Sequence, residues 1–112
     1  MSAIPALTLP APIAAYFAAK NKHDIDAMLV PFAEGASVKD EGQEHQGGAA
    51  VRFWMEDTTR KYRVTVEVKD VSDAAGRSIV SALVSGNFPN SPVLLHYAFT
   101  LSGPNITRLE IS

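Results

Sequence analysis

Residues 36–48 read ASVKDEGQEHQGG, a polar stretch with three carboxylates between two segments of helical pattern. Residues 37–39 are typical of a strand, the Glu-Gly pair at 41–42 is typical of a tight turn, and residues 43–46 return along the first arm. The stretch therefore predicts a β-hairpin. We expect Asp40, next to the turn, to point inward, although an acid in this position often serves only the turn.

Two short helices are predicted before the hairpin. Pro12 suits the first turn of a helix, and Asp24 suits the N-cap of the next. In the first helix the helical spacing connects Ile13, Tyr16, Phe17 and Lys20, of which the first three form an apolar face. The second helix is predicted to bury Ile25, Met28, Leu29 and Phe32, with Pro31 near its end.

A third helix and a run of strands are predicted after the hairpin. The inner face of this helix is marked by Val51, Trp54, Met55 and Thr58. After Lys61 the apolar period changes from 3.6 to 2, which indicates strands. The predicted strands are residues 62–69, 78–85, 93–101 and 106–111, with turns at 73–76, 86–92 and 102–105. Four consecutive strands allow an antiparallel meander, so the pattern predicts an α+β fold.

The composition is that of a globular domain. The chain has 112 residues, 46% of them hydrophobic, and a formal net charge of −2. Cysteine is absent, which excludes disulfides, thiolate metal sites and a cysteine nucleophile. The basic residues do not cluster, so nucleic acid is not an expected partner. No apolar stretch is long enough to span a membrane, and we expect a cytoplasmic protein.

Three stretches resemble one known superfamily. They are YFAAKNKHDIDAML at residues 16–29, ASVKDEG at 36–42 and GGAAVRFW at 47–54. Together they resemble the NTF2-like superfamily, in its SnoaL-like and ketosteroid-isomerase-like branch. The resemblance implies an arm at residues 1–11 and a single domain at 12–112. It also implies a cone of three N-terminal helices packed on a curved, mostly antiparallel sheet, with a pocket at its open end.

The resemblance suggests catalytic residues as well. Ketosteroid isomerases have an oxyanion-hole tyrosine in the first helix and a general-base aspartate in the first hairpin, and Tyr16 and Asp40 match these positions. The third acid of the isomerases falls at Tyr97 or at Leu95, and neither is a carboxylate. Tyr97 would supply a second phenolic donor, whereas Leu95 would leave one donor. SnoaL-type cyclases use an aspartate deeper in the sheet, but here the inner strands carry no acid before Glu110.

A larger set of residues is expected to line the pocket. The position of Tyr16 on the apolar face of its helix favours a core tyrosine with a satisfied hydroxyl over an oxyanion donor, and His45 either pairs with Asp40 or faces solvent. Three histidines at 23, 45 and 96 match no metal-ligand spacing, so no metal is predicted. The expected lining residues are Phe17, Phe32, His45, Trp54, Val66, Leu83, Leu95, Phe99, Leu109 and Ile111.

Two classes of function are consistent with these residues. One is a cofactor-independent isomerase or cyclase that uses Asp40 to move a proton on a hydrophobic carbonyl compound. The other is a non-catalytic module that binds a small hydrophobic molecule, or only dimerises. Leu94 and Ala98 add apolar area to the outer face of the sheet. We therefore expect a homodimer through that face.

Overall fold

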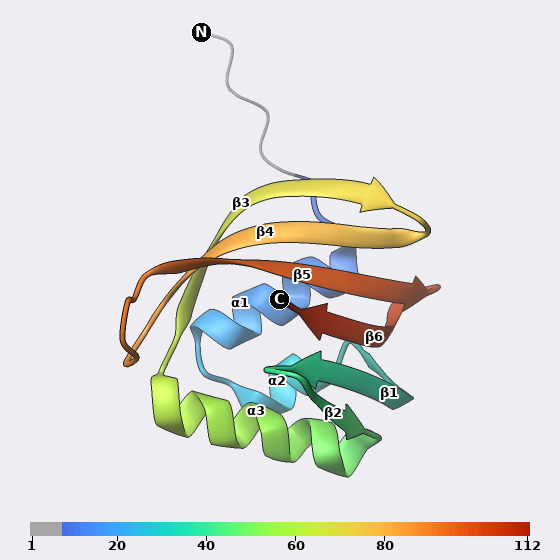
Figure 1. Cartoon of the computed structure of the whole chain (residues 1–112). Coiled ribbons are helices and arrows are strands. Elements are labelled where there is room, and N and C mark those ends of the chain that lie inside the picture. Colours follow the sequence, from blue (N-terminus) through green and yellow to red (C-terminus); the bar gives the residue numbers. More distant parts are fainter. Residues whose placement is uncertain (1–7) are drawn as a thin grey trace, which may run out of the picture.

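The computed structural model describes residues 8–112, and within them the chain forms three helices and six strands (Figure 1). The predicted N-terminal arm lies mostly outside the described residues, since 1–7 are not among them. In chain order the elements are α1 (Ala11–Asn21), α2 (Ile25–Leu29), β1 (Phe32–Asp40), β2 (Gln43–Gln46), α3 (Gly48–Tyr62), β3 (Thr65–Ala74), β4 (Arg77–Ser85), β5 (Val93–Ser102) and β6 (Asn105–Ile111).

All six described strands belong to one sheet, in the order β2-β1-β6-β5-β4-β3. The last four strands form the antiparallel meander that the sequence predicts. The sheet as a whole is mixed, because β1 pairs with β6 in parallel. The third helix follows the β1–β2 hairpin, as the order of the sequence patterns predicts, so only two of the three helices precede the sheet and the expected group of three N-terminal helices is inexact.

The second helix is shorter than predicted. Its start is as expected, since the Asp24 side chain accepts a hydrogen bond of 3.1 Å from the Ala27 amide. The helix ends at Leu29, because Pro31 has no N–H to continue the helical bonds. Phe32 therefore opens strand β1 instead of lying on the helix, and the Pro31 carbonyl accepts the Ile106 amide of β6 at 2.8 Å.

The boundary between α3 and β3 also differs from the prediction. Tyr62 is the last residue of the helix, and Arg63 ends it in the left-handed conformation, with φ 46° and ψ 50°. The residues that alternate from Tyr62 to Val66 therefore do not all belong to a strand. Strand β3 begins at Thr65 and runs on to Ala74, so the turn to β4 is tighter than the predicted 73–76.

The registers of the strands decide which side chains face the helices. In β5 the fully buried Phe99 and the buried Tyr97 point inward, while His96 is exposed on the other face. Pairing of Val80 with Tyr97 places Val80, Ala82 and Val84 on the same inner face. The intervening residue Leu83 pairs with the exposed Leu94 and lies on the outer face.

Aromatic side chains fill the narrow end of the cone. The Phe17 ring of α1 meets the rings of Tyr97 and Phe99 at centroid distances of 5.1 and 5.7 Å. The Tyr16 ring lies 5.5 Å from Phe32 of β1. These edge-to-face contacts fix α1 on the inner face of the sheet.

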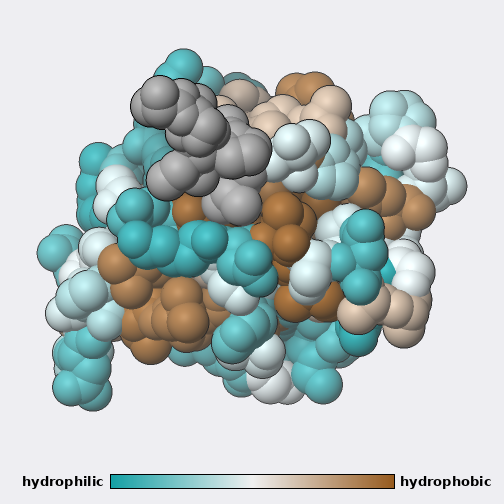
Figure 2. All heavy atoms as spheres, turned by 90° about the horizontal axis from the view of Figure 1, so that it is seen from above, coloured by the Kyte–Doolittle hydropathy of each residue, from teal (hydrophilic) through white to brown (hydrophobic). Residues whose placement is uncertain are grey.

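The outer surface is mixed in character. Viewed from the side of β3 (Figure 2), hydrophobic atoms form separate areas between hydrophilic side chains. The exposed large hydrophobic residues among 8–112 are Val30, Phe53, Val93 and Leu94. Within the same residues, no helix has the length and apolar character that a membrane span requires.

Gly86 joins β4 to the loop at the open end of the cone and has no room for a side chain. A Cβ there would lie 2.5 Å from the Tyr62 carbonyl oxygen, which accepts the Asn87 amide at 2.7 Å. We expect Gly86→Ala to lower the free energy of unfolding by about 1–3 kcal/mol, as measured by urea denaturation. Gly35→Ala is the matched control, because nothing lies within 4 Å of its Cβ. Equal stability of the two variants would contradict the close contact between Gly86 and the Tyr62 carbonyl.

Candidate functional site

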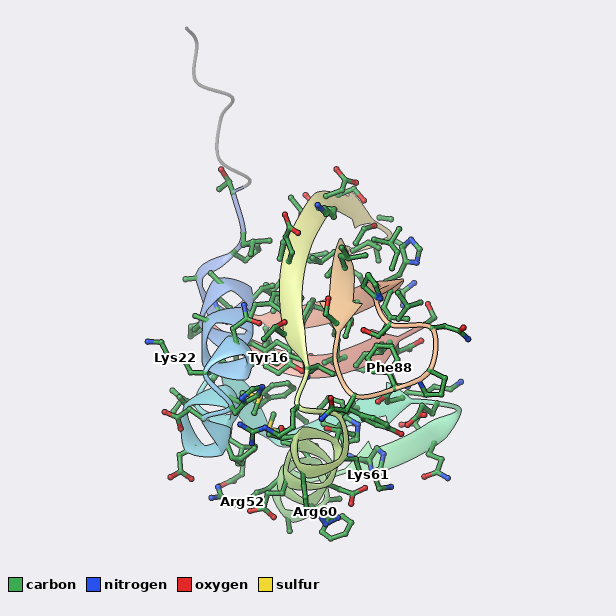
Figure 3. The ribbon with its side chains drawn as sticks, turned by 90° about the vertical axis from the view of Figure 1, so that its left-hand side faces the viewer. Tyr16, Lys22, Arg52, Arg60, Lys61 and Phe88 are labelled. Carbon is green, nitrogen blue, oxygen red and sulfur yellow. The ribbon has the colours of Figure 1, made fainter. Side chains whose placement is uncertain are left out.

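A pocket of about 480 Å³ opens at the wide end of the cone. Its mouth lies between the end of α3, the β1–β2 turn and the β4–β5 loop, and Figure 3 shows Phe88 on that loop. The wall is mostly apolar and includes Trp54, Val64, Val84, Phe88, Val93, Leu95 and Ile111. The ionisable side chains along it are Lys20, Asp40, Glu41, Tyr62 and Tyr97. An apolar pocket with a few convergent polar groups is typical of a small-molecule site.

Asp40 is the last residue of β1 and is positioned by the tight turn that follows it. Glu41 and Gly42 have φ values of 52° and 77°, as the predicted two-residue hairpin requires. Asp40 is two residues after the fully buried Val38, so strand alternation directs its side chain to the inner face. The Trp54 indole N–H donates to Asp40 Oδ2 at 3.0 Å. This bond fixes the orientation of the Asp40 side chain at the pocket wall.

Lys20 is the functional candidate that the sequence analysis missed. It is 7% exposed, and its Nζ lies 5.7 Å from the centre of the Tyr16 ring and 5.8 Å from that of Trp54. Burial lowers the pKa of the Lys20 ammonium to about 8, although the nearby Asp40 carboxylate opposes this shift. The signal was present in the sequence, because Lys20 is four residues after Tyr16 and shares its helix face.

Two tyrosines lie beside the acid. Burial raises the pKa of Tyr97, and the Asp40 charge adds to the effect. The pKa of Tyr16 is raised well above its usual value, first by burial and then by Tyr97 and Asp40. Both phenols are therefore protonated donors at neutral pH. Tyr97 lines the pocket, whereas Tyr16 is fully buried behind its wall.

The comparisons with known proteins agree with this fold. A family model described as a SnoaL-like domain matches residues 13–105. The chain belongs to the SnoaL-like family. Its fold is NTF2-like, as the resemblance in the sequence indicated. No curated protein matches the chain by sequence.

Solved structures similar to this SnoaL-like chain include candidate enzymes. The crystal structure of a proposed polyketide cyclase from Sinorhizobium meliloti is 38% identical, with a TM-score of 0.88 and coverage of 93% of this chain and 95% of that one. A second proposed polyketide cyclase, from Pseudomonas putida, is 21% identical over 96% and 92% of the chains, with a TM-score of 0.80. A protein of ketosteroid-isomerase-like fold from Catenulispora acidiphila is 20% identical over 94% and 86%, with a TM-score of 0.81.

The structure brings only part of the predicted site of this SnoaL-like domain to the pocket. The predicted residues that line it are Asp40, Trp54, Leu95, Tyr97 and Ile111. The predicted residues that belong to the packed interior instead, outside the pocket lining, are Tyr16, Phe17, Phe32, Val66, Phe99 and Leu109. Fewer residues than expected line the pocket, because the aromatic contacts of α1 occupy part of the interior of the cone.

Two other predicted lining residues have different positions. Leu83 lies on the outer face, because β4 is apolar on both sides and its sequence does not show which face is inside. His45 of β2 is half-buried, and its ring centroid lies 6.1 Å from that of Trp54. Among the described residues it forms no ion pair with Asp40, which instead accepts the indole N–H. Within residues 8–112, no group of three or more His, Asp or Glu side chains is placed to hold a metal ion.

The Tyr16 hydroxyl is buried without a hydrogen-bond partner among the described residues. An unpartnered buried hydroxyl costs stability, so we expect Tyr16→Phe to raise the free energy of unfolding by about 1–3 kcal/mol. Denaturant unfolding at pH 7 measures this change. Tyr62→Phe is the control, since Tyr62 is only partly buried at the end of α3. A loss of stability in Tyr16→Phe would mean that the hydroxyl has a structural partner.

Proposed function

We propose that this SnoaL-like domain catalyses an isomerase- or cyclase-type reaction on a hydrophobic carbonyl compound, with Asp40 as the general base. The observation that carries the proposal is the Asp40 carboxylate at the wall of an apolar pocket, held by the 3.0 Å bond from Trp54. A base that removes a proton from carbon needs a carboxylate of fixed orientation close to an apolar substrate. The family membership and the similar proposed polyketide cyclase support the same class of chemistry.

The proposed reaction moves only protons and electron pairs. Asp40 takes a proton from the carbon next to the carbonyl, and the electron pair of that C–H bond forms an enolate. In an isomerisation, the protonated Asp40 returns the proton to another carbon of the conjugated system. In a cyclisation, the enolate carbon attacks a second carbonyl of the same molecule, and the new alkoxide takes the proton from Asp40. Neither route needs a redox cofactor.

Tyr97 is the proposed donor to the enolate oxygen. It lines the pocket, and its raised pKa keeps the phenol protonated and able to donate. Leu95 lies on the same face of β5 and lines the pocket, but it has no donor. Tyr16 does not line the pocket, but it lies close enough to Tyr97 and Asp40 for both to raise its pKa. We propose for Tyr16 a supporting part, in which its hydroxyl polarises the site without reaching the substrate.

Exchange of carbon-bound protons tests the proposal without knowledge of the product. Apolar ketones, including steroid enones and polyketide-like aryl ketones, are incubated with the protein in D₂O, and deuterium uptake is followed by mass spectrometry. We expect wild type to accelerate exchange next to the carbonyl of at least one class, and Asp40→Asn to abolish the acceleration. Glu34→Gln is the matched control, since Glu34 is an exposed acid of the same strand. Ketones that quench Trp54 fluorescence without any exchange would support a binding module instead.

We also propose a homodimer through the outer face of the sheet. Leu94 is 49% exposed there beside the partly buried Leu83, and Ile79 pairs with Ala98 on the same face. We expect Leu94→Glu to convert a dimer to a monomer in size-exclusion chromatography with light scattering. Phe53→Glu is the control, because Phe53 is 64% exposed on α3. A monomeric wild type, or a dimer broken only by Phe53→Glu, would contradict this interface.

A further inference from the structure

Within residues 8–112, the ammonium group of Lys20 forms no salt bridge. Yet Lys20 lines the pocket and is only 7% exposed. Its nearest identified neighbours are the ring faces of Tyr16 and Trp54, at 5.7 and 5.8 Å from Nζ to the ring centres. A buried charge is normally paired at contact distance, whereas Asp40, the acid that acts on Lys20, forms no salt bridge with it.

The two aromatic faces and the nearby Asp40 compensate the buried charge only in part. Cation–π contacts at these distances are near the outer limit of about 6 Å. Burial still lowers the pKa of Lys20 to about 8, despite the opposing influence of Asp40. A bound anion would neutralise the remaining positive charge of Lys20, because the two charges would pair in a pocket from which most water is excluded.

We propose that Lys20 recognises an anionic oxygen, a carboxylate or an enolate, on the small molecule that fills the pocket. The apolar body of that molecule then lies along the wall formed by Val84 and Leu95, with its reacting carbon towards Asp40. This inference rests on the proposed function for its pocket, but it does not require Asp40 to act as a base. Lys20 then adds a cationic group to the proposed phenolic donor Tyr97 on the pocket wall.

A pair of isosteric probes tests this recognition. The anion 4-phenylbutanoate and the neutral 4-phenylbutanamide differ in charge but little in shape, and neither absorbs where tryptophan is excited. Trp54 is the single tryptophan of the chain and lines the pocket, so its fluorescence reports binding there. We expect wild type to bind the anion about ten- to hundredfold more tightly than the amide, as a charge-assisted hydrogen bond implies.

Three variants separate this inference from the proposed function. Lys20→Met should bind both probes equally. Lys22→Met is the matched control, because Lys22 is an exposed lysine at the same end of α1, and this variant should keep the wild-type preference for the anion over the amide. Asp40→Asn should tighten binding of the anion, because it removes a like charge from the pocket. Equal binding of both probes by wild type, or no binding of the anion at millimolar concentration, would overturn the inference. Loss of proton exchange with the anion preference intact would overturn only the Asp40 base.

Discussion

Replacing Asp40 by asparagine is expected to lower the rate of proton exchange about 10²–10⁴-fold, which is the usual contribution of a general base. The amide oxygen of asparagine can still accept the Trp54 indole N–H, so the side chain keeps its orientation. It cannot take a proton from carbon.

The stability of Asp40→Asn separates a catalytic acid from a turn residue. An acid that bonds to the turn backbone costs about 0.5–2 kcal/mol when it is replaced. The Asp40 side chain bonds instead to an indole, and asparagine can keep that bond, so we expect the free energy of unfolding to stay within about 0.5 kcal/mol of wild type. Glu34→Gln should match wild type in both rate and stability. A variant that is strongly destabilised but fully active would show that Asp40 serves the turn.

Replacing Lys20 by methionine is expected to stabilise the protein at pH 7 by about 3 kcal/mol, which is the linkage value of the pKa shift. Burial lowers the pKa of Lys20 from 10.5 to about 8. At pH 7 the folded protein therefore carries the cost of a buried ammonium, which the unfolded chain does not. Methionine has a similar shape and no charge, so it fills the same space without that cost. Denaturant unfolding of wild type, Lys20→Met and Lys22→Met measures the difference.

The pH dependence of wild-type stability provides a second measurement. Between about pH 8 and 10 the folded state loses the Lys20 proton while the unfolded state retains it. The unfolded state then binds more protons, so the free energy of unfolding rises with pH over this interval. Above pH 10 the raised pKa values of Tyr16 and Tyr97 act in the opposite direction, because the unfolded tyrosines ionise first. Lys20→Met should lack the rise, and a rise that persists in this variant would contradict the assignment to Lys20.

Local patterns in the sequence predicted much of the fold. The Glu-Gly pair at 41–42 accepts positive φ values, and this placed the hairpin turn correctly. Strand alternation from Val38 places Asp40 on the inner face, where it lines the pocket. The change of the apolar period from 3.6 to 2 after α3 predicted the four strands of the meander, because the period at which side chains face one side follows directly from the backbone conformation.

The sequence by itself thus determined the order of the elements, the hairpin and the acid at its end. Only the tertiary structure decided which side of the double-faced strand β4 is buried, and it placed Leu83 outside. The tertiary structure also brought Lys20 of α1 into the pocket of Asp40 and left Tyr16 behind the wall. Local periodicity gives the face of a residue within its own element, whereas distances between elements depend on sheet curvature and on how side chains pack across the core.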